Sequence, residues 1–220
     1  MVFASASLTE AYTAIGDAFM AAHPGVEVTF NFAASSELAA QIADGAPADV
    51  LATADTTTMQ VAIDGLAAAG AEAPSPAQFA TNSMQIVVGP GNPKGVEGLA
   101  DLADPDLLVV LCAVDTPCGT YAATVLENAG VAVTPVSFEQ NVKGVLSKVT
   151  SGEADAGIVY RTDVIAAGAD ATGVDIDAAV NVVAEYPIAA LTGDLAAAFE
   201  AFVLGAEGRS ILSKFGFGLP

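Results

Sequence analysis

Residues 2–22 have the sequence VFASASLTEAYTAIGDAFMAA, in which a short apolar strand pattern passes directly into an amphipathic helix pattern. Ser7 lies at this passage. The same order, a strand pattern followed by a small or hydroxyl residue and then a helix pattern, recurs around Ser35, Cys118 and Val142. Because strands that alternate with helices are joined by right-handed crossovers, this layout predicts an α/β fold with mainly parallel sheets flanked by helices.

The apolar periodicity predicts the individual elements. We expect strands at 2–6, 26–32, 49–54, 84–88, 107–113, 156–160 and 188–191. We expect helices at 8–22, 37–43, 57–69, 119–128, 142–150, 195–204 and 208–215.

Two segments of the chain are predicted to connect two lobes. Residues 89–93 are the turn formers GPGNP, and Tyr186-Pro187 precedes a late strand pattern. We therefore expect lobe I to contain residues 1–88 and 186–220, and lobe II to contain residues 89–185. Two such crossover segments would form a hinge, and the cleft between the lobes would face the strand ends where α/β sheets bind ligands.

The composition limits the class of ligand. Of 220 residues, 53% are hydrophobic, and Gly, Pro, Asp and Ser interrupt the apolar runs before they could span a bilayer. The chain has 26 acidic and 6 basic residues, which argues against nucleic acid or an anionic membrane surface as a partner. With a net charge of -20, an anionic ligand would have to be held by local donors.

The predicted helix N-termini are suited to bind an anion through neutral groups. Unpaired backbone N–H groups and the helix dipole favour negative charge there, and Ser7 and Ser35 add hydroxyls. The two serines follow strands of one sheet and should lie at the same edge. Tyr160 ends an apolar strand, where its phenol is either a further donor or a rim aromatic in water. Ser7-Leu8-Thr9-Glu10 also fits a capping box, which would give Ser7 a purely structural role.

The only cysteines are Cys112 and Cys118. Their spacing fits neither a CxxC motif nor a zinc site. A local disulfide, which would indicate an oxidising compartment, and two unpaired thiols both stay open. Met1 is followed at once by a strand pattern rather than a signal peptide, so either the protein is cytosolic or a leader has been removed.

We expect no enzymatic activity. The single histidine, His23, stands before Pro24-Gly25 at a helix end, a poor position for a general base. No nucleophile elbow, zinc-protease, P-loop or dinucleotide motif is present. The acidic pairs Asp101/Asp104 and Asp175/Asp177 lack the spacing of a calcium loop and are interpreted as solvated loop charge.

The chain resembles the molybdate-binding proteins of bacterial ABC importers, which have a type II periplasmic-binding-protein fold. The resemblance covers nearly the whole chain, and its segments follow in the family's order. They are VFASASLT at 2–9, FAASSEL at 32–38, GAPADV at 45–50 continuing to Ala54-Asp55, Pro117-Cys118-Gly119, Asn141-Val142, GIVY at 157–160 and YPI at 186–188.

The resemblance implies a ligand set and a function. The hydroxyls and amides of Ser7 and Ser35, the amides of Cys118 and Val142, and the hydroxyl of Tyr160 would bind molybdate or tungstate. Cys118 departs from the family, where alanine is common, but only its amide is used. The protein would have no cofactor or bare metal ion. It would be an exported monomer in the periplasm or on the outer face of the cytoplasmic membrane, tethered at most by a lipid, that delivers the anion to an ABC importer permease.

Two alternatives remain open at this point. The same scaffold binds other tetrahedral oxyanions such as sulfate, and a similar fold serves as a small-molecule effector domain of regulators. The second alternative would normally come with a helix-turn-helix, and none is visible in this sequence.

Overall fold

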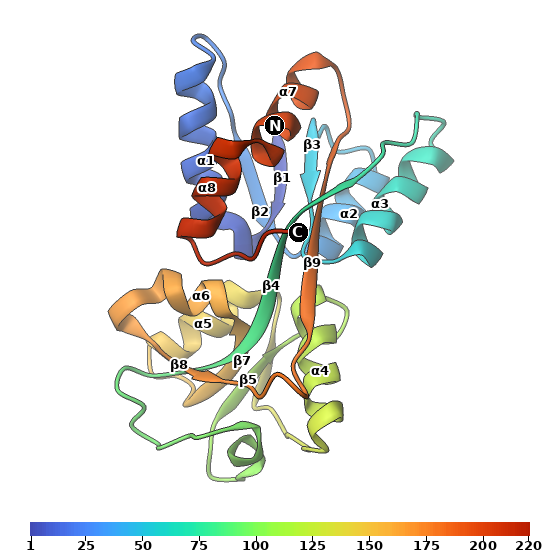
Figure 1. The fold of residues 1–220 in the computed structure, drawn as a ribbon. Coiled ribbons are helices and arrows are strands. Elements are labelled where there is room, and N and C mark those ends of the chain that lie inside the picture. The colour runs from blue at the N-terminus through green and yellow to red at the C-terminus, as the bar shows by residue number, and fades with distance from the viewer. The chain divides into compact units, whose positions relative to one another are not determined.

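The computed structural model describes residues Met1–Pro220, which form two compact units. Unit 1 contains Met1–Thr81 and Glu185–Pro220, and unit 2 contains Asn82–Ala184. The chain passes between the units inside two strands, β4 (Ala77–Val88) and β9 (Val183–Ala190). The first passage thus falls within one continuous strand (Figure 1) rather than at the turn formers of residues 89–93.

Unit 1 is built on a sheet with the strand order β2-β1-β3-β9. The strands β1 (Val2–Ser5), β2 (Phe30–Ala33) and β3 (Val50–Ala52) are parallel, and β9 is antiparallel to β3. Helices α1 (Thr9–Ala22), α7 (Asp194–Leu204) and α8 (Ala206–Lys214) lie on one side of this sheet, and α2 (Ser35–Ala43) and α3 (Thr56–Ala68) lie on the other (Figure 1). A short 3-10 turn, Ala6–Leu8, joins β1 to α1.

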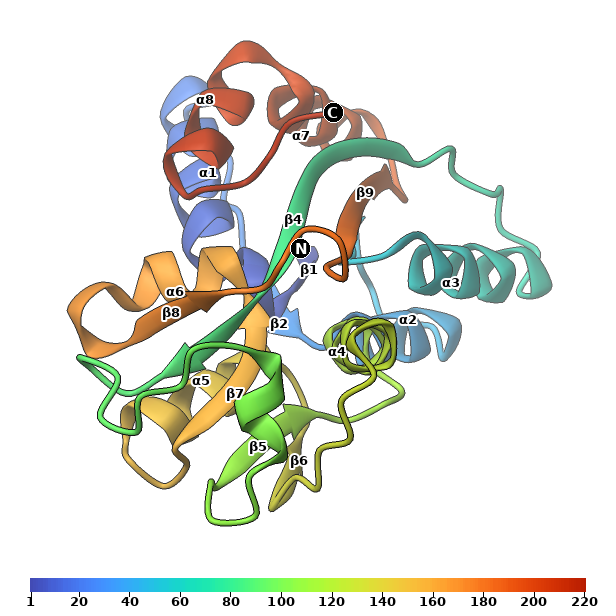
Figure 2. The ribbon, with the colours of Figure 1, turned by 60° about the horizontal axis from the view of Figure 1, so that its bottom comes forward.

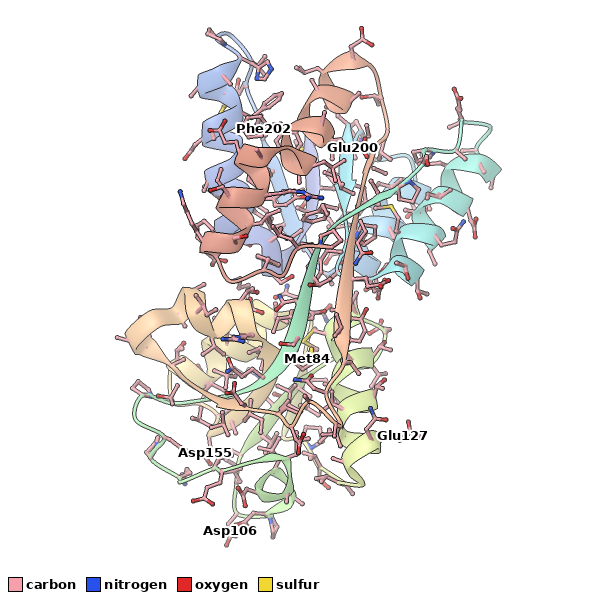
Figure 3. All side chains as sticks on the ribbon, in the orientation of Figure 1. Met84, Asp106, Glu127, Asp155, Glu200 and Phe202 are labelled. Atoms are coloured by element: carbon pink, nitrogen blue, oxygen red, sulfur yellow. A yellow bond between two sulfur atoms is a disulfide. The ribbon has the colours of Figure 1, made fainter.

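Both faces of the unit 1 sheet are covered by side chains. Beneath α2 and α3, the core contains Phe3, Leu38, Leu51, Met59 and neighbouring aliphatic residues. On the other side the core is aromatic. Its ring contacts include Tyr12 with Phe79 at 5.7 Å, Phe19 with Phe199 at 5.2 Å, and Phe19 with Phe202, labelled in Figure 3, at 5.5 Å. A central strand covered on both faces reads as a continuous apolar run, which explains the sequence of β1.

Unit 2 has the strand order β4-β7-β5-β6, and β8 (Thr172–Asp175) also pairs with β4, along Gln85–Val88. The strands β5 (Val109–Cys112), β6 (Ser137–Glu139) and β7 (Ala156–Tyr160) are parallel, whereas β4 is antiparallel to β7 and β8. Helices α5 (Val142–Thr150) and α6 (Arg161–Ala167) lie together on one side, and α4 (Pro117–Ala129) lies on the other (Figure 2). Short 3-10 turns occupy Leu99–Ala103 and Gly168–Asp170.

The predicted α/β class is confirmed, with differences in detail. The strand expected at 26–32 begins only at Phe30, because Val26 closes a turn by donating to the carbonyl of His23. Strands β6 and β8 and helix α6 were not predicted, since SFE, TGVD and RTDVIAA are too short to show a period. None of the helices is long and apolar enough to cross a membrane.

Candidate functional site

In unit 1, the carboxyl ends of three parallel strands share one edge of the sheet. β1 pairs in register with β2, so that Ser5 lies opposite Ala33. Ser7 and Ser35 each follow that pair by two residues along their own strand-to-helix connection. The structure therefore places the two serines at the same edge of the sheet, as parallel pairing requires.

Ser7 is buried, and its hydroxyl contacts two other hydroxyls. Its Oγ lies 2.9 Å from the Tyr186 Oη and 3.3 Å from the Ser5 Oγ. The helix that follows, α1, has Leu8 at its N-cap and no side-chain cap. The capping-box interpretation of Ser7 and Glu10 is therefore wrong, because the Ser7 hydroxyl bonds to side chains from β1 and β9 instead of the helix backbone.

Ser35 is the first residue of α2, and it is also buried. Its Oγ accepts a hydrogen bond from the backbone N–H of Ala54, 3.0 Å away, just beyond the end of β3. Ala34 occupies the N-cap position without a side-chain cap bond. Since the Ala54 amide already donates to the Ser35 oxygen, the Ser35 proton is directed toward some other acceptor.

In unit 2, Cys118 is the second residue of α4 and forms a disulfide with Cys112, the last residue of β5. The side chain of the N-cap residue Thr116 accepts from the Gly119 amide at 3.2 Å, and its carbonyl accepts from the Thr120 amide at 2.9 Å. Neither acceptor of Thr116 takes the Cys118 amide. That N–H therefore lies at the positive end of the helix outside the capping bonds.

Close packing fixes where α4 begins. A Cβ on Gly119 would lie 1.9 Å from the carbonyl oxygen of Ala113, which no side chain can approach. Only glycine lets the first turn of α4 pass so close to the end of β5. The glycine and the disulfide thus hold the Cys118 amide in place from two directions.

Helix α5 repeats this arrangement with a different cap. The Asn141 Oδ1 accepts from the amides of Lys143 at 3.0 Å and Gly144 at 3.2 Å. The Asn141 carbonyl accepts from Val145. The amide of Val142, the first residue of the helix, is not taken by Asn141. As in α4, the N-cap residue accepts from later amides of the helix and makes no hydrogen bond to the candidate donor, the Val142 amide.

Tyr160 is the buried last residue of β7, and a carboxylate ties it to α5. The fully buried Asp163 accepts from the Tyr160 amide through Oδ2 at 3.2 Å, and its Oδ1 lies 3.1 Å from the Lys143 Nζ. Because Lys143 follows Val142, Asp163 links the end of β7 to the start of α5, and both places carry a candidate donor. Asp163 was not predicted from the sequence. Its only signal was an acid three residues after Tyr160, where a helix begins.

The candidate donors are uncharged groups. They are the hydroxyls of Ser7, Ser35 and Tyr160 and the amides of Cys118 and Val142. Lys143, the cation next to them in sequence, is paired with Asp163. Lys148 is paired with Glu139 at 2.6 Å, and this hydrogen bond lowers the pKa of the Glu139 carboxyl below its ordinary value.

The other candidate residues have structural contacts. The His23 Nδ1 lies 2.9 Å from the Phe19 carbonyl. The carboxylates of the acidic pairs accept hydrogen bonds from nearby amides. Asp101 accepts from the backbone amides of Glu97 and Gly98, and Asp104 accepts from that of Asp106. Asp175 accepts from the side-chain amide of Gln85, and Asp177 accepts from the backbone amide of Ala179. No group of three or more His, Cys, Asp or Glu side chains could hold a metal ion.

Unit 1 also contains a cavity of about 240 Å³ that lies away from these donors. Its lining includes Val2 and Val50, which begin β1 and β3, and Phe19 near the end of α1. The cavity therefore lies at the amino ends of the strands, whereas Ser7 and Ser35 follow the carboxyl ends.

The chain is similar to known proteins over nearly its whole length. The family model described as "Bacterial extracellular solute-binding protein" matches residues 1–218. The molybdate-binding protein ModA of Mycobacterium tuberculosis is 46% identical over 224 aligned residues, covering 100% of this chain and 84% of the relative.

Two solved structures show the same fold at about 20% identity. The periplasmic molybdate-binding protein of Azotobacter vinelandii has a TM-score of 0.80 at 20% identity, covering 100% of this chain and 98% of its own. The sulfate-binding protein SubI of Mycobacterium tuberculosis has the same TM-score and identity, covering 98% of this chain and 85% of its own. The fold alone therefore does not separate one tetrahedral anion from another.

Proposed function

This chain belongs to the family of bacterial extracellular solute-binding proteins, and on that premise we propose that it captures molybdate or tungstate by hydrogen bonds from neutral donors. Ser7 and Ser35 donate from unit 1, and Cys118, Val142 and Tyr160 donate from unit 2. The 46% identity to a molybdate-binding relative over the full chain favours molybdate over sulfate.

The proposal rests mainly on one observation: in both units, the hydrogen bonds around several of the candidate donors do not use the donors' own protons. The Ser35 oxygen accepts from the Ala54 amide, and the caps Thr116 and Asn141 accept from later amides in their helices. Each contact leaves a hydroxyl proton or a first-turn N–H for another acceptor. A tetrahedral oxyanion is suited to such an array because all of its oxygens accept.

Neutral donors are strong enough for tight binding. A hydrogen bond to a charged group contributes roughly 1.5–3 kcal/mol, so about seven such bonds exceed the roughly 8 kcal/mol that micromolar affinity requires. The surplus must offset desolvation of the dianion and closure of the units. With a net charge of -20, long-range repulsion opposes the binding of an anion, so these local bonds have to supply the affinity.

The remaining parts of the proposal follow from family membership. The protein would act outside the cytoplasmic membrane, as a monomer, and deliver its anion to the permease of an ABC importer. It would need no cofactor and catalyse no reaction. Binding would shift the units from an open to a closed arrangement that the permease recognises.

Calorimetric titration with molybdate, tungstate, sulfate and phosphate tests the function. We expect tight binding of the first two and at least a hundredfold weaker binding of the others, a difference of about 2.7 kcal/mol. Ser7→Ala, Ser35→Ala and Tyr160→Phe should each weaken molybdate binding. Sulfate binding tighter than molybdate would replace the proposed ligand, and unchanged affinity in all three variants would remove the proposed site.

A further inference from the structure

We propose that Ser5 and Tyr186 determine which protonation state of an oxyanion the protein accepts. In this proposal both of their hydroxyls donate to the Ser7 oxygen and fill its two acceptor positions, so that Ser7 can only donate toward a ligand. A fully deprotonated oxyanion satisfies such a donor, whereas an oxyanion that presents a proton there does not. The inference rests on the proposed function, because it concerns the Ser7 donor of that site.

The geometry places three hydroxyls in a row inside unit 1. The Ser7 Oγ lies 2.9 Å from the Tyr186 Oη and 3.3 Å from the Ser5 Oγ. All three side chains are buried, with exposed fractions of 3%, 0% and 5% for Ser7, Tyr186 and Ser5. A serine hydroxyl has one proton and two lone pairs, so two neighbouring hydroxyls that donate to it fill its acceptor capacity.

A bound dianion sets the direction of the protons in this row. A hydrogen bond to a charged oxygen is roughly twice as strong as one between neutral groups. The Ser7 proton is therefore drawn to the anion, and the phenol of Tyr186 and the hydroxyl of Ser5 donate toward Ser7. Hydrogen bonds that run in one direction strengthen each other, which reinforces this order.

Tyr186 is held firmly in the position that this role requires. Its ring packs edge-to-face against Phe217 at 5.5 Å and Phe79 at 6.2 Å. Strand β9 runs antiparallel to β3, and the Pro187 carbonyl accepts from the Thr53 amide at 3.1 Å. This pairing brings the start of the unit 1 part of β9 to the edge that carries Ser7.

Ser35 provides a contrast within the same unit. Its oxygen accepts a hydrogen bond from the Ala54 amide, whereas the Ser7 oxygen has two hydroxyl neighbours. Discrimination against a protonated ligand oxygen should therefore depend on Ser7 more strongly than on Ser35. Ser5 and Tyr186, rather than Ser7 itself, are the residues that cause this discrimination.

The test compares sulfate with hydrogen phosphate, which have the same charge and nearly the same size and differ by one proton. Displacement of bound molybdate by each anion is measured at a pH where inorganic phosphate is the hydrogen phosphate dianion. The variants are Tyr186→Phe and Ser5→Ala, each of which opens one acceptor position on Ser7. We expect the preference for sulfate over hydrogen phosphate to fall about tenfold in each, and molybdate affinity to fall about three- to tenfold.

The matched control is Tyr12→Phe. Tyr12 is a fully buried tyrosine of the same unit whose hydroxyl has no hydrogen-bond partner. The Tyr12→Phe variant should leave both the preference for sulfate over hydrogen phosphate and the molybdate affinity unchanged. If Tyr186→Phe unfolds the protein, Ser5→Ala decides the matter alone.

The outcomes separate this inference from the proposed function. If the unaltered protein binds molybdate and Ser7→Ala weakens that binding, but the anion preference stays the same in Tyr186→Phe and Ser5→Ala, only the role of the hydroxyl row is overturned. If the unaltered protein does not bind molybdate, the proposed function fails and the inference fails with it.

Discussion

The Oγ of Ser35 accepts a hydrogen bond from the backbone amide of Ala54 at 3.0 Å, although 19 residues separate them in the chain. The contact joins the first residue of α2 to the connection that follows β3. It satisfies an amide beyond the strand end and at the same time fixes the orientation of a buried hydroxyl. A single bond thus couples the packing of unit 1 to the direction of a candidate donor.

Replacing Ser35 by alanine should weaken molybdate binding by about 10- to 100-fold, because one hydrogen bond to a charged oxygen is lost. Isothermal titration measures the change. The control is Ser36→Ala, the next residue of α2, which is partly exposed and should leave the affinity within about twofold. Equal losses in the two variants would show that the effect arises from the helix rather than from the Ser35 hydroxyl.

Replacing Gly119 by alanine should disturb both stability and binding. The added Cβ would lie 1.9 Å from the Ala113 carbonyl oxygen, so the start of α4 has to move, at a cost of about 1–3 kcal/mol in the free energy of unfolding. Because the Cys118 amide moves with it, molybdate affinity should fall as well. Gly130, at the other end of α4, has a left-handed φ of +65° and nothing near its Cβ, so Gly130→Ala serves as the control for stability loss without a binding defect.

Reducing the Cys112–Cys118 disulfide should lower the free energy of unfolding by about 2 kcal/mol, the value expected for so short a closed loop. Chemical denaturation with and without a thiol reductant measures this difference. The double variant Cys112→Ser, Cys118→Ser should match the reduced protein. A stability that does not change on reduction would mean that the bond contributes nothing to the folded state.

The Glu200 carboxyl, labelled in Figure 3, should make stability depend on pH. Burial raises its pKa above the ordinary value, even though its Oε2 accepts from the Ala190 amide at 3.2 Å. The folded state then holds the proton more readily than the unfolded chain. The stability from this group is present below the ordinary pKa and lost as pH rises through the raised pKa.

Glu200→Gln keeps an oxygen acceptor and removes the charge. At neutral pH it should raise the free energy of unfolding by about 0.5 kcal/mol or less, since solvent screens this partly exposed group. The difference should vanish in acid. Glu207→Gln, at an exposed position of α8, is the matched control for the substitution itself. A Glu200→Gln variant that is less stable at neutral pH would contradict this account.

Much of the candidate site could be predicted because it lies at strand-to-helix junctions. Ser7, Ser35, Cys118 and Val142 all follow a strand pattern, and the carboxyl ends of parallel strands share an edge. These local patterns place the residues on an edge without any knowledge of distant contacts.

The contacts that orient the donors could not be predicted, because they join distant parts of the chain. The partner of Ser7 is Tyr186, 179 residues away, and the ion pair of Asp163 is with Lys143 on another helix. The antiparallel strands β4 and β9 also escaped the prediction of mainly parallel sheets. Their direction is set by the passage of the chain between the units, which leaves no periodic signal in the sequence.

A crystal structure with bound molybdate tests the central claim most directly, because the anomalous scattering of molybdenum locates the anion without ambiguity. We expect its oxygens within hydrogen-bond distance of the Ser7, Ser35 and Tyr160 hydroxyls and the Cys118 and Val142 amides. An anion held by lysine or arginine side chains, or bound away from these five residues, would contradict the account.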